Sequence, residues 1–219
     1  MTAKTAPNRS QWLRLLGIAL LIGTLVTTLE ILTRERIVAS QTSAALDYLR
    51  QVLGPDDQGA AITFENWPIP NRQLGLLGLS EGDEMHIALR AGQPIAAIVP
   101  SISNAGYGGA IQLLVGIDFT GRIIAVRVIS HRETVGLGDK IEIAKSDWIE
   151  AFSKRSLSDP AAKYWAVKAD GGIYDQFTGA TITPRAVVNQ VAATLQFFAD
   201  ERTALAARGT SQANPEARE

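Results

Sequence analysis

The chain contains no cysteine and only two histidines, His86 and His131, among its 219 residues. Without cysteine there is no disulfide, no thiolate site for zinc or iron–sulfur clusters, and no thiol nucleophile. Two isolated histidines do not predict a metal site. The formal net charge is −1 and no basic cluster is present, which argues against electrostatic binding of nucleic acid. Neither a GxGxxG segment nor a Walker A loop occurs, so no nicotinamide or P-loop nucleotide site is predicted.

One long apolar run extends from Leu15 to Leu32, and Glu30 is its only charged residue. Its length is close to the ~20 residues that cross the hydrocarbon core of a bilayer. Three basic residues precede the run and two follow it, which slightly favours a cytoplasmic amino terminus. We therefore predict a cytoplasmic segment at 1–14, a single transmembrane helix at 15–33 and a folded domain outside the cytoplasm.

Two other interpretations of the apolar run are weaker. A cleaved signal peptide would need a small-residue cleavage site, for which Val38-Ala39-Ser40 is a poor candidate. A buried core helix would show an apolar stripe, whereas here apolar residues cover every face.

Helical spacing of apolar residues over 37–53, ended by Gly54-Pro55, predicts a juxtamembrane helix. From Asp56 to Glu84, glycine, proline, asparagine and aspartate are frequent, and we expect irregular structure there. Two hairpins are then predicted, Met85–Arg90 with Pro94–Val99, and Gln112–Asp118 with Ile123–Ile129. The loop between them, SNAGYGGA, has glycines that permit tight turns or close approach of a ligand.

The remaining elements are mostly helical. We expect a helix over Ile141–Ser153 with Trp148 and Phe152 on one face, then short strands near 164–167 and 171–174. Thr183 as N-cap and Pro184 as first helical residue predict the start of a last helix with an apolar stripe. The fold class is thus α+β: a single transmembrane helix, then one domain at 54–206 whose antiparallel sheet packs against helices. A polar tail at 207–219 is expected to be disordered.

The segment YDQFTGATITPR places small and hydroxyl-bearing residues directly before the amino terminus of that last helix. A helix start offers unpaired N–H groups and partial positive charge, which favour a phosphate group. Thr181 and Thr183 supply hydroxyls, and Arg185 can add a charge-assisted contact. The residues alone leave an alternative open, in which the segment is only a helix cap.

The stretch DQFTGAT resembles the flavinylation motif of FMN-binding domains. That motif consists of Asp, two variable residues, Ser or Thr, usually Gly, then Ala and an acceptor Thr. The matching residues are Asp175, Thr178, Gly179, Ala180 and, as acceptor, Thr181. The resemblance implies that FMN is joined covalently through its phosphate to the Thr181 hydroxyl, in a phosphoester bond made by a separate flavin transferase.

A second segment, HRETVGLGDKIE, resembles a loop of the same family that helps to form the flavin pocket. The implied flavin contacts are Glu133, Thr134, Gly136, Leu137 and Lys140. Glycines there permit unusual backbone angles, and Leu137 can pack on a ring. The family often has proline where this chain has Val135, and we expect a less rigid loop. His131 is interpreted as a structural hydrogen-bonding residue.

From Trp12 to Ala206 the order and spacing of these features are similar to those of the G subunit of Rnf/Rsx ion-translocating oxidoreductase complexes. The related C subunit of sodium-pumping NADH:quinone reductases shares the flavin motif and is an alternative, but it is usually longer. The resemblance implies an inner-membrane subunit with a periplasmic flavin domain that relays electrons and has no catalytic acid, base or nucleophile. The implied partners are the other complex subunits, especially the flavin-bearing D subunit.

Two further functions remain open on the sequence alone. A membrane-tethered FMN-binding or sensing module would bind the flavin without relaying electrons. A structural anchor protein would bind no flavin, and its DQFTGAT segment would only cap a helix.

Overall fold

The computed structural model describes Val52, Leu53 and residues 62–213. Contacts divide the chain into two units, Met1–Asp47 and Tyr48–Glu219, and every described residue belongs to the second. The predicted segments at 1–14 and 15–33 lie outside the described residues, as does most of the predicted helix at 37–53. No helix in the described part is long and apolar enough to cross a membrane.

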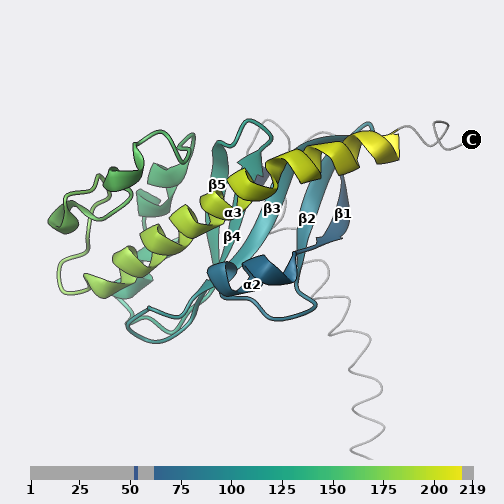
Figure 1. Ribbon diagram of the computed structural model, residues 1–219. Coiled ribbons are helices and arrows are strands. Elements are labelled where there is room, and N and C mark those ends of the chain that lie inside the picture. Colours follow the sequence, from purple (N-terminus) through teal and green to yellow (C-terminus); the bar gives the residue numbers. More distant parts are fainter. Residues whose placement is uncertain (1–51, 54–61, 214–219) are drawn as a thin grey trace, which may run out of the picture. The chain divides into compact units, whose positions relative to one another are not determined.

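The described part contains one antiparallel sheet, in which each strand pairs with its neighbours in sequence (Figure 1). Its strands are β1 (Ile62–Pro68), β2 (Glu84–Arg90), β3 (Gln93–Ser103), β4 (Ile111–Asp118) and β5 (Ile123–Ser130). Both predicted hairpins are confirmed, and β3 is longer than predicted. With helices packed on the sheet, the domain has the α+β class that the sequence predicts.

Local contacts close both hairpins. Ala91 and Gly92 connect β2 to β3 with φ angles of 50° and 76°, the turn geometry that matches the twist of paired strands. After β4, the Asp118 carboxylate accepts hydrogen bonds from the backbone N–H groups of Thr120 at 2.8 Å and Arg122 at 3.1 Å. These turns fix the register of the sheet, and thereby which side chains face the core.

Helix α3 (Ile182–Ala213) lies across one face of the sheet (Figure 1). The predicted apolar stripe is confirmed, because Val187, Val191 and Leu195 are at most 2% exposed. They join one hydrophobic cluster with alternate residues of the central strands, including Val99 and Val115. Burial of such side chains contributes roughly 1.5–3 kcal/mol each relative to exposure, so this contact is a major source of stability.

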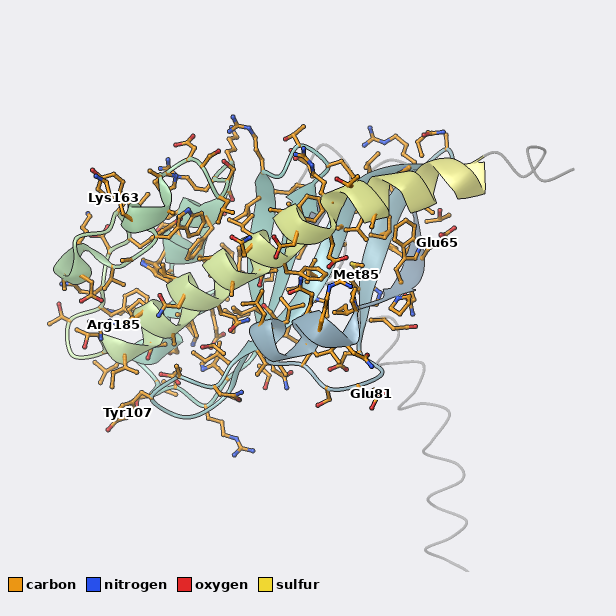
Figure 2. The ribbon with its side chains drawn as sticks, viewed as in Figure 1. Glu65, Glu81, Met85, Tyr107, Lys163 and Arg185 are labelled. Atoms are coloured by element: carbon orange, nitrogen blue, oxygen red, sulfur yellow. The ribbon has the colours of Figure 1, made fainter. Side chains whose placement is uncertain are left out.

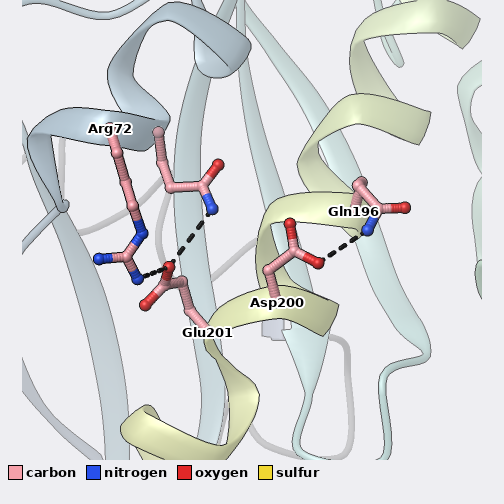
Figure 3. A network of polar contacts seen from close by, with 5 residues as sticks. Arg72, Gln196, Asp200 and Glu201 are labelled. Atoms are coloured by element: carbon pink, nitrogen blue, oxygen red, sulfur yellow. Dashed lines mark hydrogen bonds and ion pairs between the residues drawn. The ribbon is translucent and has the colours of Figure 1, made fainter.

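A polar contact joins α2 (Asn71–Leu77) to α3 at Glu201, past the middle of that helix (Figure 3). The Glu201 carboxylate is 5% exposed and accepts from the Arg72 guanidinium at 2.5 Å and from the Gln73 amide at 3.3 Å. A buried carboxylate is tolerated here because it has a cationic partner.

The opposite face of the sheet is also apolar. Val52 and Leu53 are buried there in a second cluster with Ala88, Ala96 and Ile98. A Cβ added to Gly116 of β4 would lie 2.3 Å from Val52 Cγ1, so glycine permits this close approach. Val52 and Leu53 therefore cover part of this face of the sheet.

The prediction of irregular structure from Asp56 to Glu84 is wrong for β1 and α2. β1 is held by pairing with β2, in which Trp67 lies opposite Met85, and such a contact has no signal in the local sequence. α2 is seven residues long and ends at Gly78, which has a φ of 68°. A helix of this length is too short to show a clear period.

The prediction of one helix over Ile141–Ser153 is also wrong. Two short 3₁₀ helices replace it, η2 (Gly138–Ile141) and η3 (Asp147–Phe152). Ser146 is extended between them, and its hydroxyl accepts from the Trp148 N–H at 3.1 Å. Such side-chain bonds to the backbone compete with continuous helix.

The two short strands predicted near 164–167 and 171–174 do not form; the 3₁₀ turn η4 (Ala162–Tyr164) ends where the first was expected, and η5 (Lys168–Asp170) lies between them. A single parallel bridge joins Val167 to Tyr174.

The start of α3 differs from the prediction. The helix begins at Ile182, so Thr181 precedes it and Thr183 is its second residue. Thr183 is 1% exposed and its hydroxyl donates to Glu133, so the assignment of Thr183 as N-cap is wrong. At its other end α3 continues to Ala213, past the predicted start of a polar tail; residues 214–219 lie outside the described part.

Candidate functional site

The DQFTGAT segment forms a tight turn that leads directly into α3. The Ala180 N–H donates to the Phe177 carbonyl at 3.1 Å, and Gly179 has a φ of 81°. A positive φ at the third position of a turn favours glycine, which explains its place in the segment. Thr181 follows the turn, is exposed, and is the last residue before the helix. Its hydroxyl is therefore accessible beside the positive end of the helix dipole.

A cavity of about 330 Å³ opens at this helix start. Three segments line it: the loop after β3, the loop after β5, and the turn with the first residues of α3. The lining residues are Tyr107, Glu133, Thr134, Leu137, Gly138, Gly179, Ala180, Thr181, Ile182 and Thr183. Its volume and its mixture of apolar walls with a few polar groups are typical of small-molecule sites.

Glu133 joins these three segments. Its side chain is 5% exposed; Oε1 accepts from the Gly108 N–H at 2.8 Å, and Oε2 accepts from the Thr183 hydroxyl. A Cβ at Gly108 would lie 1.9 Å from the Arg132 carbonyl oxygen, so the two loops approach as closely as backbones can. The walls of the cavity are thus fixed to one another through one carboxylate.

Aromatic side chains of the core hold the turn that precedes α3. The Trp148 indole N–H donates to the Asp175 carbonyl at 2.8 Å, and its ring meets Phe177 edge-to-face at 5.1 Å. Trp148 also packs edge-to-face on Phe152 at 5.4 Å, which confirms the predicted common face. The core therefore holds the segment that begins at Asp175 in place.

His131 is placed by hydrogen bonds on both ring nitrogens. Nδ1 accepts from the Glu133 N–H at 3.0 Å, and Nε2 lies 2.9 Å from the Glu142 carboxylate. Since Nδ1 acts as acceptor, the proton is on Nε2. This fits the interpretation of His131 as a structural residue that orients the Glu133 loop.

Six of the residues predicted for the site line the cavity: Glu133, Thr134, Leu137, Gly179, Ala180 and Thr181. Five others do not: Gly136, Lys140, Asp175, Thr178 and Arg185.

Two of the charged residues outside the cavity form ion pairs on the surface. Arg185 donates to Asp170 at 2.6 and 2.9 Å, and Asp175 pairs with Lys168 at 2.6 Å. Hydrogen bonds from Arg185 lower the pKa of the Asp170 carboxyl and, reciprocally, raise that of the guanidinium. In this arrangement Asp170 is the partner of the Arg185 guanidinium, and a phosphate contact of Arg185 stays a prediction.

The structure adds lining residues that the sequence did not indicate individually. Tyr107 is 71% exposed and Ile182 is 44% exposed, and both contribute to the walls (Figure 2 shows Tyr107 on its loop). The glycine-rich loop around Tyr107 was predicted as a place of close approach, but its distance in sequence from Thr181 concealed the contact. Together with Leu137, these side chains give the cavity an exposed apolar rim.

Two other cavities in the described part are larger. One of about 420 Å³ lies beside α2 and residues Glu201 to Leu205 of α3, and one of about 680 Å³ lies beside the β4–β5 turn. Neither is lined by residues of the turn before α3. Chemistry rather than volume therefore decides the assignment, because among these three cavities the Thr181 cavity alone combines an apolar rim with an exposed hydroxyl at the start of a long helix.

This arrangement suits a ligand with a flat apolar part and a phosphate. The rim residues Tyr107, Leu137 and Ile182 can cover a ring system, and the N–H groups at the start of α3 favour an anion. Gly179 has room for a ligand close to its backbone, since a Cβ there would meet only Leu137, at 3.6 Å. FMN has both parts, so the residues present fit it.

Comparison with known proteins agrees with this geometry. Residues 106–196 match the family described as FMN-binding domain. The chain is similar to proteins named as the G subunit of an ion-translocating oxidoreductase complex. The relative from Pseudomonas aeruginosa is 43% identical over 92% of this chain and 95% of its own length. The relative from Stutzerimonas stutzeri is 45% identical over 87% and 78%, and that from Shewanella loihica is 42% identical over 87% and 90%.

Proposed function

Because the chain belongs to the family of G subunits of ion-translocating oxidoreductase complexes, we propose that it relays electrons through an FMN attached covalently to Thr181. Its role as an electron-transfer subunit with an FMN-binding domain follows from this membership. The attachment site and the residues around the flavin are the proposal.

One observation carries the assignment of Thr181. Its hydroxyl is exposed at the end of a glycine turn, next to the first residue of α3 and in the wall of the apolar-rimmed cavity. A phosphoester at that oxygen places the phosphate at the helix start, where N–H groups and the dipole stabilise its charge. Thr178, in the same turn, is exposed but does not line the cavity.

The residues of this chain hold the cofactor, which supplies the redox chemistry by accepting one or two electrons. Tyr107, Leu137 and Ile182 limit access of water to the ring. The turn from Phe177 to Ala180 fixes the direction in which Thr181 points. No residue is assigned as an acid, base or nucleophile, because relay of electrons requires none.

The cellular setting completes the proposal. The apolar run from Leu15 to Leu32 supports a single-pass anchor in the inner membrane with the flavin domain in the periplasm. An anchor raises the effective concentration of the domain near membrane-embedded redox partners. We assign the other subunits of the complex as partners, with the flavin-bearing D subunit as neighbour, and a flavin transferase for maturation.

The direct test is to co-express the full chain with a flavin transferase and look for flavin fluorescence after denaturing electrophoresis. We expect a fluorescent band and one added FMN, less water, on the peptide that contains Thr181. Thr181→Ala should remove both signals, whereas Thr203→Ala, at an exposed threonine outside the motif and the cavity, should retain them. A fluorescent Thr181→Ala variant would show that the acceptor is another residue. Slow reduction by the assembled complex would favour a sensing module over a relay.

A further inference from the structure

We infer that Glu133 is a positioning residue that fixes the start of α3 and whose negative charge, which has no ionic partner among the described residues, lowers the reduction potential of the flavin. This inference rests on the proposed function. It changes the role expected for Glu133, which the sequence resemblance places among direct flavin contacts.

The contacts of Glu133 show that the protein already uses both carboxylate oxygens. Oε1 accepts from the Gly108 N–H at 2.8 Å and Oε2 from the Thr183 hydroxyl. Since the side chain is only 5% exposed, little of it is available to a ligand. Its effect on a bound flavin is therefore exerted through Thr183, two residues after the attachment point, and through its charge.

Glycines make the room for this carboxylate. A Cβ at Gly106 would lie 2.8 Å from Glu133 Oε1, and one at Gly138 would lie 2.9 Å from Glu133 Cβ and 3.0 Å from Thr183 Oγ1. Both loops thus approach Glu133 and Thr183 too closely for a side chain at Gly106 or Gly138. Such packing holds the first turn of α3 in one position, and with it the direction of the Thr181 side chain.

The charge of Glu133 has no cationic partner in the described part of the chain. Its two hydrogen-bond donors, a backbone N–H and a hydroxyl, are neutral. Glu201 provides the contrast, because it is equally buried at 5% exposure but pairs with the Arg72 guanidinium at 2.5 Å (Figure 3). Glu133 thus places a negative charge beside the cavity, where low dielectric strengthens its effect on a ligand.

Reduction adds negative charge to a flavin, and a fixed carboxylate nearby opposes it. The reduced form is therefore disfavoured relative to the oxidised form, which means a lower potential. A lower potential makes the flavin a stronger donor to the next carrier. Because Glu133 lies in the cavity wall, its charge can lower the reduction potential without contact between the carboxylate and the flavin ring.

The test is a redox titration of full chains carrying the flavin, with Glu133→Gln, Glu133→Asp and Glu201→Gln compared with the unaltered protein. Glu133→Gln removes the charge and keeps the size. We expect its oxidised–reduced equilibrium to shift at least tenfold toward the reduced form, which is about 30 mV for a two-electron step. Glu133→Asp keeps the charge and should stay within threefold of the unaltered protein.

Glu201→Gln is the matched control for loss of a buried carboxylate. It lies farther along α3, about 27 Å from Thr183 at about 1.5 Å per residue, so the potential should not change. A Glu133→Gln variant that carries flavin and has an unaltered potential would overturn the charge role. If the unaltered protein itself carries no flavin on Thr181, the proposed function fails instead.

A second pair of variants tests the positioning role even if Glu133→Gln does not fold. Thr183→Val removes only the hydroxyl that Glu133 holds, and Thr183→Ser retains it. We expect Thr183→Val to lose most of the covalent flavin, measured by peptide mass, while Thr183→Ser keeps most of it. Equal flavin attachment in the two variants would overturn the positioning role.

Discussion

Thr181 and Thr183 are the same residue type two positions apart, and their surroundings give them different functions. Thr181 is exposed and precedes α3, whereas Thr183 is 1% exposed and bonded to Glu133. The sequence suggests Thr183 as the cap because it stands before Pro184. Burial of its hydroxyl against a carboxylate distant in sequence is a tertiary fact that local pattern does not contain.

This difference predicts different costs in stability. Thr181→Ala removes an exposed side chain and should change the free energy of unfolding by less than about 0.5 kcal/mol. Thr183→Val leaves a buried carboxylate short of one donor and should cost roughly 1–3 kcal/mol. Denaturant unfolding of the flavin-free protein measures both. Equal losses would mean that the hydrogen bond to Glu133 contributes little.

Tyr174 is a buried phenol without a hydrogen-bond partner among the described residues. It is 1% exposed and stacks on Phe152 with ring centroids 4.5 Å apart. Burial raises the pKa of its hydroxyl far above the ordinary value of about 10. The unfolded chain therefore releases this proton at a lower pH than the folded chain.

The sign of the resulting pH dependence is fixed by that difference. The contribution of Tyr174 to the free energy of unfolding is fully present below about pH 10. It is lost as the pH rises further, by up to about 1.4 kcal/mol per pH unit. Tyr174→Phe should remove this part of the alkaline loss and cost less than about 1 kcal/mol at neutral pH, since no hydrogen bond is broken. Tyr164→Phe, at a residue 40% exposed, is the control and should leave the alkaline slope nearly unchanged. Equal alkaline loss of stability in the two variants would contradict a raised pKa of Tyr174.

Elements built from local contacts were predictable, and elements that depend on distant partners were not. The β2–β3 hairpin follows from the Ala91-Gly92 turn, and α3 from its apolar stripe. β1 forms only because it pairs with β2. The extended residue Ser146 interrupts the predicted helix because its hydroxyl accepts a hydrogen bond from the backbone. Within the site, the turn around Gly179 was likewise predictable, whereas the approach of Tyr107 was not.

The loops after β3 and β5 meet so closely that one methyl group should separate them. A Cβ at Gly108 would lie 1.9 Å from the Arg132 carbonyl oxygen, so Gly108→Ala should cost about 1–3 kcal/mol through forced displacement. It should also reduce flavin attachment, because the Gly108 N–H binds Glu133. Thermal unfolding and peptide mass are the measurements.

Gly75 in α2 provides the control, since a Cβ there meets nothing within 4 Å. Gly75→Ala should be neutral or stabilising by about 0.5–1 kcal/mol, because alanine is the better helix former. A Gly108→Ala variant as stable as Gly75→Ala would contradict the close contact of the two loops.

At the scale of the whole molecule, the sheet is apolar on both faces. α3 covers one face, and Val52 with Leu53 occupies part of the other. The cavity lies where α3 begins, and α2 contacts α3 farther along, at Gln190 and Glu201 (Figure 3 shows the Glu201 contact). The fold thus separates the cavity from the contacts between α2 and α3.

Attachment to the membrane is a property of the whole chain, and the apolar run from Leu15 to Leu32 predicts it. Leu21→Arg together with Val26→Arg places two charges in that run, at roughly 2.5–3.5 kcal/mol each near the centre of a bilayer. We expect the fluorescent flavin protein to resist carbonate extraction from membranes, and the double variant to be extracted. Leu21→Ala with Val26→Ala is the matched control and should remain bound.

The same preparation distinguishes an anchor from a cleaved signal peptide. An anchor leaves the run in the mature protein, so the intact mass should include residues 15–33. A signal peptide would remove it, and the mature protein would then be released by carbonate in every variant. Protease added outside the inner membrane should degrade the flavin domain if the amino terminus is cytoplasmic, because the bilayer then shields only the residues before the run and the run itself. A flavin domain protected from that protease would place it on the cytoplasmic side, and the periplasmic assignment would have to be reversed.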